Sequence, residues 1–143
     1  MTSSEIDAFL SRMETGVLSF ARNGEPYAIP VSYGYDSDTR TCYLRLVSTP
    51  DSTKRAFLTD SPRATLVVYD GTDDRETYHS VVAVGELVRV DPSSLSVEQI
   101  EQYGETRRPL FEIWADDQDS LDIDLYQLQP DKLTGRRTDV TWD

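Results

Sequence analysis

One stretch of the chain combines hydroxyl side chains, a helix start and a lysine, which suits a phosphate-binding site. Residues 45–55 read RLVSTPDSTKR. Thr49 and Pro50 are typical of the N-cap and first position of a helix, so a strand is predicted to lead into a helix here. The first N–H groups of a helix have no partner within it and attract anions. A capped helix without a ligand is the alternative.

Lys54 lies within this stretch and is one of only two lysines in the chain. An ammonium group in the first turns of the helix would complement a phosphate dianion through charge-assisted hydrogen bonds. An ordinary surface lysine is the alternative, and Asp51 would repel a phosphate unless its carboxylate points away.

A second candidate surface is the strand predicted over residues 27–35. Its odd positions carry the bulky residues Tyr, Ile, Val, Tyr and Tyr, and its even positions carry Ala, Pro, Ser and Gly. Side chains alternate between the two faces of a strand, so the small residues would form a flat strip for a planar ring. Pro30 has no N–H and is expected to interrupt pairing. Close strand packing is the alternative, but strip and phosphate cradle together suggest FMN or a similar phosphorylated aromatic compound.

Other catalytic chemistry finds little support in the composition. The chain has one histidine, His79, and one cysteine, Cys42. His79 is predicted to be a surface or hydrogen-bonded residue at a strand entrance, and Cys42 a small buried apolar residue rather than a nucleophile. A lone cysteine forms no intrachain disulfide or cysteine-based zinc cluster. The acidic residues of 116–124 lack the glycine and final glutamate of a calcium loop, so no metal site is predicted.

The net charge of −12 comes from 26 acidic and 14 basic residues. A surface of this sign repels nucleic acids and anionic membranes, so neither is expected as a partner. Many acids with almost no lysine indicate a salt-adapted, halophilic protein. No apolar run reaches 18 residues and the first residues do not resemble a signal peptide, so a soluble cytoplasmic protein is predicted.

Hydrophobic periodicity predicts the elements that hold these residues. A helix is expected over 3–13 with Ser3 or Ser4 as its N-cap, and short helices after Pro50 and from Ser96. Six strands are predicted, at 17–22, 27–35, 42–47, 64–69, 80–90 and 121–133. The fifth has valines on both faces and is expected to be buried on both. Strand and helix alternate too rarely for a doubly wound sheet. The fold class is therefore mainly β, a single domain over 1–143 forming a small antiparallel barrel.

Four segments resemble the pyridoxamine 5′-phosphate oxidase-related, flavin-nucleotide-binding proteins. They are residues 16–18 (GVL), 26–36 (PYAIPVSYGYD), 52–55 (STKR) and 134–137 (TGRR). This resemblance implies an FMN-binding split β-barrel that forms a homodimer, with two FMN molecules at the subunit interface. True pyridoxamine phosphate oxidases are longer and end in an arginine-containing substrate segment, so the resemblance supports FMN binding rather than that reaction.

The resemblance also implies which residues bind the cofactor. Five strand residues match those that line the isoalloxazine ring: Ile29, Pro30, Val31, Ser32 and Tyr33. The phosphate would be held by Ser52, Thr53 and Lys54. Arg45 and Arg136 match positions near the cofactor. No residue is assigned as a protein acid or base.

The leading functional hypothesis is therefore an FMN-dependent oxidoreductase whose substrate is unassigned. In such an enzyme the flavin transfers the hydride or electrons, and the protein supplies orientation and electrostatics. Two alternatives stay open: a non-catalytic flavin-binding or sensor module, and a protein that binds a deazaflavin-type cofactor.

The charge balance yields a prediction about salt. Repulsion among the 26 acidic residues should lower stability in dilute buffer, and molar salt shortens the Debye length to about 3 Å and should restore it. We expect the melting temperature of the cofactor-free protein to rise with potassium chloride from tenth-molar to several molar. A melting temperature that does not respond to salt would mean that the acidity is no salt adaptation, and a basic partner would then explain it better.

Overall fold

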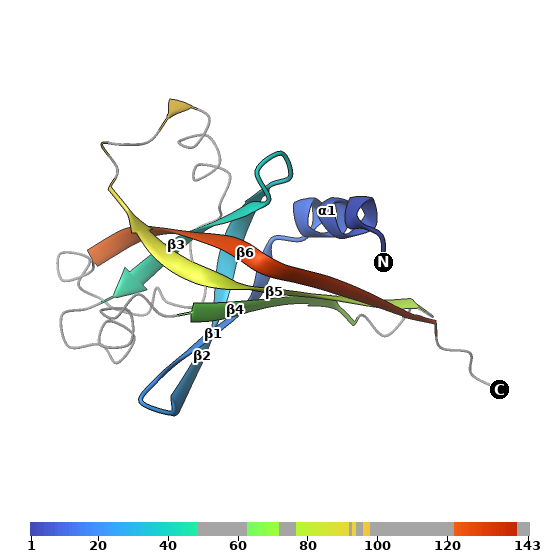
Figure 1. Cartoon of the computed structure of the whole chain (residues 1–143), viewed down its shortest axis with the longest axis horizontal. Helices are drawn as coiled ribbons and strands as arrows, with labels where there is room; N and C mark the ends of the chain where they lie inside the picture. Colours follow the sequence, from blue (N-terminus) through green and yellow to red (C-terminus); the bar gives the residue numbers. More distant parts are fainter. Residues whose placement is uncertain (49–62, 72–76, 92, 94–95, 98–121, 140–143) are drawn as a thin grey trace.

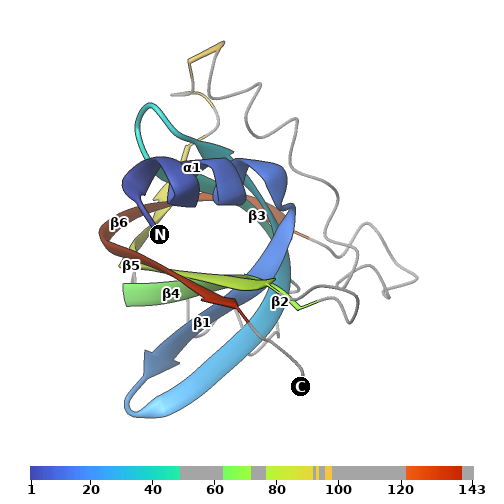
Figure 2. The same cartoon turned by 90° about the vertical axis from the view of Figure 1, so that its right-hand side faces the viewer.

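A closed ring of six antiparallel strands forms the body of the protein. The computed structural model describes residues 1–48, 63–71, 77–91, 93, 96–97 and 122–139. Within these residues the strands follow one another around the barrel in the order β1-β2-β3-β6-β5-β4, and one helix, α1, packs beside them (Figures 1 and 2). The predicted mainly β, six-stranded antiparallel barrel is confirmed.

Each predicted strand is present, with somewhat wider bounds. The elements are α1 (Ser3–Arg12), β1 (Thr15–Arg22), β2 (Glu25–Asp36), β3 (Thr41–Ser48), β4 (Arg63–Asp70), β5 (Thr77–Val90) and β6 (Asp122–Asp139). The last strand continues past its predicted end at Leu133, because its backbone pairs with β5 as far as Asp139. The prediction ended the strand at Leu133 because the apolar pattern stops there. A ladder of backbone hydrogen bonds can continue without apolar side chains. The helices predicted after Pro50 and from Ser96 fall mainly on residues 49–62 and 98–121, outside the described residues.

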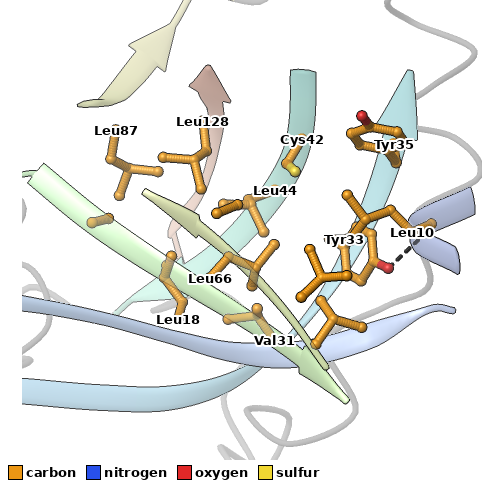
Figure 3. Packing of buried hydrophobic residues seen from close by; sticks show 14 of the residues in the cluster. Leu10, Leu18, Val31, Tyr33, Tyr35, Cys42, Leu44, Leu66, Leu87 and Leu128 are labelled. Carbon is orange, nitrogen blue, oxygen red and sulfur yellow. Dashed lines mark hydrogen bonds between the residues drawn. The ribbon is translucent and has the colours of Figure 1, made fainter. Parts of the chain in front are cut away.

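The core lies inside the ring and receives one face of every strand (Figure 3). Leucines from five strands are almost completely buried there: Leu18, Leu44, Leu66, Leu87 and Leu128. Full burial of one such side chain stabilises a protein by roughly 1.5–3 kcal/mol. The barrel is therefore held together by its interior, and its outer face is free for other functions.

The expectation that β5 is buried on both faces is wrong. Val81 and Ala83 lie in the core, whereas Val82 and Val84 are half-buried on the outer face and Val88 is 45% exposed. Valine is favoured in strands because its branched side chain suits the pleated backbone on either face. Valines at both odd and even positions of a strand therefore do not imply that both of its faces are buried.

Helix α1 begins at Ser3, as predicted, but its N-cap residue differs from the predicted ones. Thr2, rather than Ser3 or Ser4, is the N-cap: its hydroxyl accepts a hydrogen bond from the Glu5 N–H, and the Glu5 carboxylate accepts one from the Thr2 N–H. This reciprocal capping box satisfies two N–H groups instead of one. The backbone hydrogen bond to Thr2 is the main cause of the lowered pKa of Glu5.

The helix is held on the barrel by apolar contacts and by two tyrosines of β2. Ile6, Phe9 and Leu10 are buried against the core. The Tyr33 hydroxyl donates a hydrogen bond of 2.7 Å to the Leu10 carbonyl (Figure 3). The Tyr35 hydroxyl donates one of 2.6 Å to the Asp7 carboxylate. Burial raises the pKa of both phenols, so they stay neutral and keep donating.

Close approach of α1 to β6 depends on Gly135. A Cβ atom at this position would lie 2.8 Å from Ile6 Cγ1 and 2.8 Å from Met1 Sδ. Such contacts are too short for carbon and sulfur atoms, so a larger residue would push the helix away. The glycine in the Thr134–Arg137 segment (TGRR) thus has a structural role in the described fold.

A hairpin turn and a β-bulge shape the strands of the outer face. Asn23 and Gly24 have φ angles of 52° and 81° and form the predicted hairpin turn between β1 and β2. The β5–β6 register shifts between Val84 and Gly85 of β5, so Asp131 of β6 has no partner residue on β5. This bulge directs the Asp131 carboxylate to Arg63, with contacts of 2.7 and 2.9 Å.

The contact between Tyr33 and Leu10 yields a stability prediction. We expect Tyr33→Phe to lower the free energy of unfolding by about 1–2 kcal/mol, because the buried carbonyl loses its donor. The exposed Tyr69 serves as the control, and Tyr69→Phe should leave stability unchanged. Denaturant titration measures both. Tyr33→Phe should also reduce the loss of stability above about pH 10, where an unfolded phenol ionises but the buried one does not. Equal stability of the two variants would show that the hydrogen bond does not hold the helix.

Candidate functional site

The strip of small side chains predicted on β2 is present on the outside of the barrel. Val31, Tyr33 and Tyr35 are buried in the core, and Tyr27 and Ile29 pack against it. By alternation the other face carries the side chains of Ala28, Pro30, Ser32 and Gly34. Ala28 and Pro30 are exposed, and Gly34 is half-buried. The outer surface of β2 is therefore flat, as expected.

The five residues implied to line a flavin ring do not all face the same way. Ile29, Val31 and Tyr33 point their side chains towards the core, so on the outer face they offer only backbone atoms. Pro30 and Ser32 present their side chains outward. The period of two in a strand dictates this division, and a run of five consecutive residues cannot line one face with its side chains.

β2 changes its neighbour beside Ser32. Residues 25–32 pair with β1, and pairing with β3 begins only at Tyr33, opposite Leu44. Pro30 still lies opposite Val17 of β1, so the expected interruption is on the β3 side. In the described residues, β2 before Tyr33 and β3 after Leu44 share no ladder. The barrel is therefore split along this line, with Ser32 at its end.

Ser32 has an unusual environment for a polar residue. Its side chain is 1% exposed, yet its Oγ has no hydrogen-bond partner among the described residues. A buried hydroxyl without a partner costs roughly 1–3 kcal/mol, so native structures rarely leave one unsatisfied. A hydroxyl both donates and accepts, so it suits the carbonyl and ring nitrogen atoms at the edge of a flavin. The site thus fits a planar, polar-edged ring.

Arg45 of β3 lies on the same outer surface. Continuing the β2–β3 register by one residue past Tyr33 and Leu44 sets Arg45 opposite Ser32. Arg45 is half-buried, and none of its contacts with the described residues is an ion pair. A guanidinium without a carboxylate partner is available to an anionic or carbonyl group of a ligand. Arg45 thus lies on the outer side of β3 one residue past the end of the β2–β3 ladder, as Ser32 does on β2.

Tyr43 belongs to this surface but is not evident from the sequence alone. It lies opposite Gly34 on the outward side of β3, yet it is only 3% exposed. Only the alternation around the buried Cys42, Leu44 and Leu46 indicates its face. Because it is almost fully buried, its ring adds packing beside the strip rather than surface open to a ligand.

The predicted phosphate-binding residues Ser52, Thr53 and Lys54 lie outside the described residues. They follow β3 in the chain, which ends at Ser48 beyond Arg45. Their role in binding the phosphate therefore stays a prediction from the sequence.

Arg136 is not part of the surface around Ser32. It is exposed on β6 and lies opposite Ser80 of β5. In the ring β6 is two strands away from β2, with β3 between them. Arg45 lies opposite Leu125 of β6, which is eleven residues, or roughly 36 Å of extended strand, from Arg136. One chain cannot place Arg136 beside Ser32 and Arg45.

Cys42 and His79, the chain's single cysteine and histidine, both have surroundings typical of structural residues rather than of a nucleophile or a base. Cys42 is fully buried, and burial raises the pKa of its thiol to about 12, so it is not a reactive thiolate. His79 packs on Phe9 of α1, with ring centroids 5.6 Å apart. Its Nδ1 atom has no partner in the described part of the chain, so it is not the hydrogen-bonded residue that was one of the two expectations. No group of three or more potential metal-ligating side chains occurs among the described residues.

Comparison with known proteins identifies relatives of this architecture. Residues 2–137 match the family model described as pyridoxamine 5′-phosphate oxidase. No protein in a curated collection matches the sequence significantly.

Several solved structures share the fold. The FAD binding protein from Mycobacterium smegmatis is 14% identical and has a TM-score of 0.70, with 99% of this chain and 98% of that chain covered. An FAD-binding protein from Mesorhizobium loti is 19% identical and has a TM-score of 0.65, with 96% of each chain covered. A heme binding protein from Mycobacterium smegmatis is 15% identical with a TM-score of 0.65, and 96% of this chain covers 57% of that one. At these identities the likeness concerns the fold.

Proposed function

The chain belongs to the pyridoxamine 5′-phosphate oxidase family, and from this premise we propose that it binds FMN and acts as a flavin-dependent oxidoreductase. The single observation that carries the proposal is the buried, unpartnered Ser32 hydroxyl on the outer strip of β2, at the split between β2 and β3. The finer assignment, FMN rather than FAD or heme, rests on the resemblance of residues 52–55 (STKR) to a flavin phosphate site and on the flat strip.

Each part of the proposed site has one task. The isoalloxazine ring would be held by Pro30, Ser32 and the backbone atoms of Ile29, Val31 and Tyr33, with the Ser32 hydroxyl available to its polar edge. Ser52, Thr53 and Lys54 would hold the phosphate.

Arg45 supplies a positive charge near the ring, which favours electron density there. When bound, the flavin supplies hydride or electron transfer. The protein's own residues would bind and orient the ring, and the β2 strip would exclude water from the ring face that lies against it.

We also propose that the protein is a homodimer. The family resemblance implies a dimer, and an apolar row on the outer face supports it, formed by Pro30, Val17 and Val67 on three adjacent strands. Val17 and Val67 are half-buried and point away from the core. A second copy would cover this row, and its own Arg136 could then reach a flavin on β2.

A non-catalytic flavin-binding module is the second candidate, favoured by the lack of an assigned protein acid or base near the strip. The visible spectrum of the reduced and oxidised protein separates the two. Bleaching of the flavin bands by a nicotinamide donor supports the oxidoreductase, and flavin bands that persist with every donor support the binding module. A spectrum with deazaflavin bands instead would support the alternative of a protein that binds a deazaflavin-type cofactor.

None of the helices in the described part of the chain has the length and apolar character to span a bilayer. We propose a single domain over 1–143 that works in the cytoplasm at high salt.

The phosphate contact gives the central test of the function. We expect Lys54→Ala to weaken FMN binding roughly ten- to a hundredfold, because it removes a charge-assisted hydrogen bond worth about 1.5–3 kcal/mol. Fluorescence titration of FMN measures the affinity. The matched control is Lys132→Ala, which removes the only other lysine, an exposed residue on β6. An FMN affinity unchanged by Lys54→Ala would remove Lys54 from the site, and no flavin binding by the unmodified protein would reject the proposed function.

Assembly gives an independent prediction. Light scattering at high salt should return a mass of two chains per particle, and Val17→Asp should shift the mass towards one chain by putting a charge into the apolar row. Val97→Asp, at a position that is 73% exposed, is the control and should leave the mass unchanged. One chain per particle for the unmodified protein would reject an interfacial flavin site.

A further inference from the structure

Three side chains from adjacent strands form one row on the outer face, opposite the β2 strip. Tyr69 of β4 lies opposite Ser80 of β5, and Ser80 lies opposite Arg136 of β6. Strands are about 4.8 Å apart, so the row spans about 10 Å from tyrosine to arginine. Tyr69 is 62% exposed and is the only aromatic among the exposed large apolar residues of the described chain. An uncovered ring beside a hydroxyl and a guanidinium is an unusual combination for a surface without a ligand.

A hollow lies at the arginine end of this row. It has a volume of about 300 Å³ and is lined by Ser80, Val82, Thr134, Gly135 and Arg136. Such a volume is at the lower end for small-molecule sites. The two hydroxyls and the guanidinium converge on it because Ser80 lies opposite Arg136, and Thr134 is the next outward residue of β6. Together they offer the donors that a phosphate group accepts.

The charges around the hollow are opposite in sign to those of the chain as a whole. In a protein with a net charge of −12, Arg136 has neither an ion pair nor a hydrogen bond in the described part of the structure. Its neighbour in the sequence, Arg137, contacts Glu5 at 3.9 Å. The outward positions of 80–84 on β5 and 132–136 on β6 carry no carboxylate. The nearby Asp131 is bound to Arg63. An unpaired cation here is free to bind an anion.

We propose that the row Tyr69–Ser80–Arg136 with its hollow is a binding site for a nucleoside diphosphate, separate from the flavin strip. The base stacks on the Tyr69 ring, which offers a π-face to any base. Arg136, Ser80 and Thr134 bind the phosphates. The span of the row matches the separation of base and phosphates in one nucleotide, so ring and guanidinium can contact the same molecule.

The test is calorimetric titration of the full chain, saturated with FMN, with ADP and separately with pyrophosphate. We expect ADP to bind, and Arg136→Gln to weaken both ligands tenfold or more. Tyr69→Ala should weaken ADP severalfold and leave pyrophosphate unchanged. The matched control is Arg137→Gln, which removes the same charge from the adjacent residue and should change neither affinity. Arg136 and Tyr69 are exposed, so the variants should fold, and their melting temperatures verify this.

Four results would overturn the proposal. They are the absence of ADP binding both with and without FMN, equal weakening by Arg137→Gln, ADP binding that is indifferent to Tyr69→Ala, and ADP binding that occurs without FMN but not in the FMN-saturated protein. The last result would assign the hollow to the phosphate of a flavin held by a second copy. If the protein binds no FMN, the proposed function fails, and the same titrations without FMN still test the nucleotide site.

Discussion

Closure of six strands into a ring is the constraint on which the rest of the structure depends. Each strand must give one face to the interior, and the leucines from five strands fill that interior almost without exposure. Because side chains alternate, the opposite face is released from packing and can carry small, polar or charged residues. Ser32, Arg45 and Arg136 all lie on this released face. The barrel also has a defined end, where α1 is held by hydrogen bonds from Tyr33 and Tyr35.

The closed ring also decides which residues can act together. β2 and β5 occupy opposite positions in the ring, so the strip around Ser32 and the centre of the row at Ser80 lie on different sides of the barrel. The split between β2 and β3 leaves an unpaired backbone line beside Ser32, and a flat molecule there would satisfy a hydroxyl that the described chain leaves without a partner. A barrel of this kind can carry two binding surfaces without either disturbing the core.

Charge has a different role on different faces. Most described arginines are engaged by acids, as with Arg63 and Asp131 or Arg89 and Asp124. Such exposed pairs add little stability, typically below about 1 kcal/mol each. Arg45 and Arg136 instead lie on outer faces without an acidic partner in the described structure. In a strongly acidic protein these unpaired cations are the best electrostatic indicators of where anionic ligands bind.

The sequence by itself determined the fold class, the strands and the flat strip of β2, because a period of two in side-chain size is a local property that any strand would show. It also indicated Cys42 as a buried, unreactive thiol. The same period placed Ile29, Val31 and Tyr33 on the inward face, as the structure has them. The sequence could not show that Ser32 is buried without a partner in the described chain, nor that Arg136 lies far from Arg45. Those facts depend on register and on ring order, which follow from pairing between residues distant in the chain. Only the tertiary structure therefore decided which of the candidate residues share a surface.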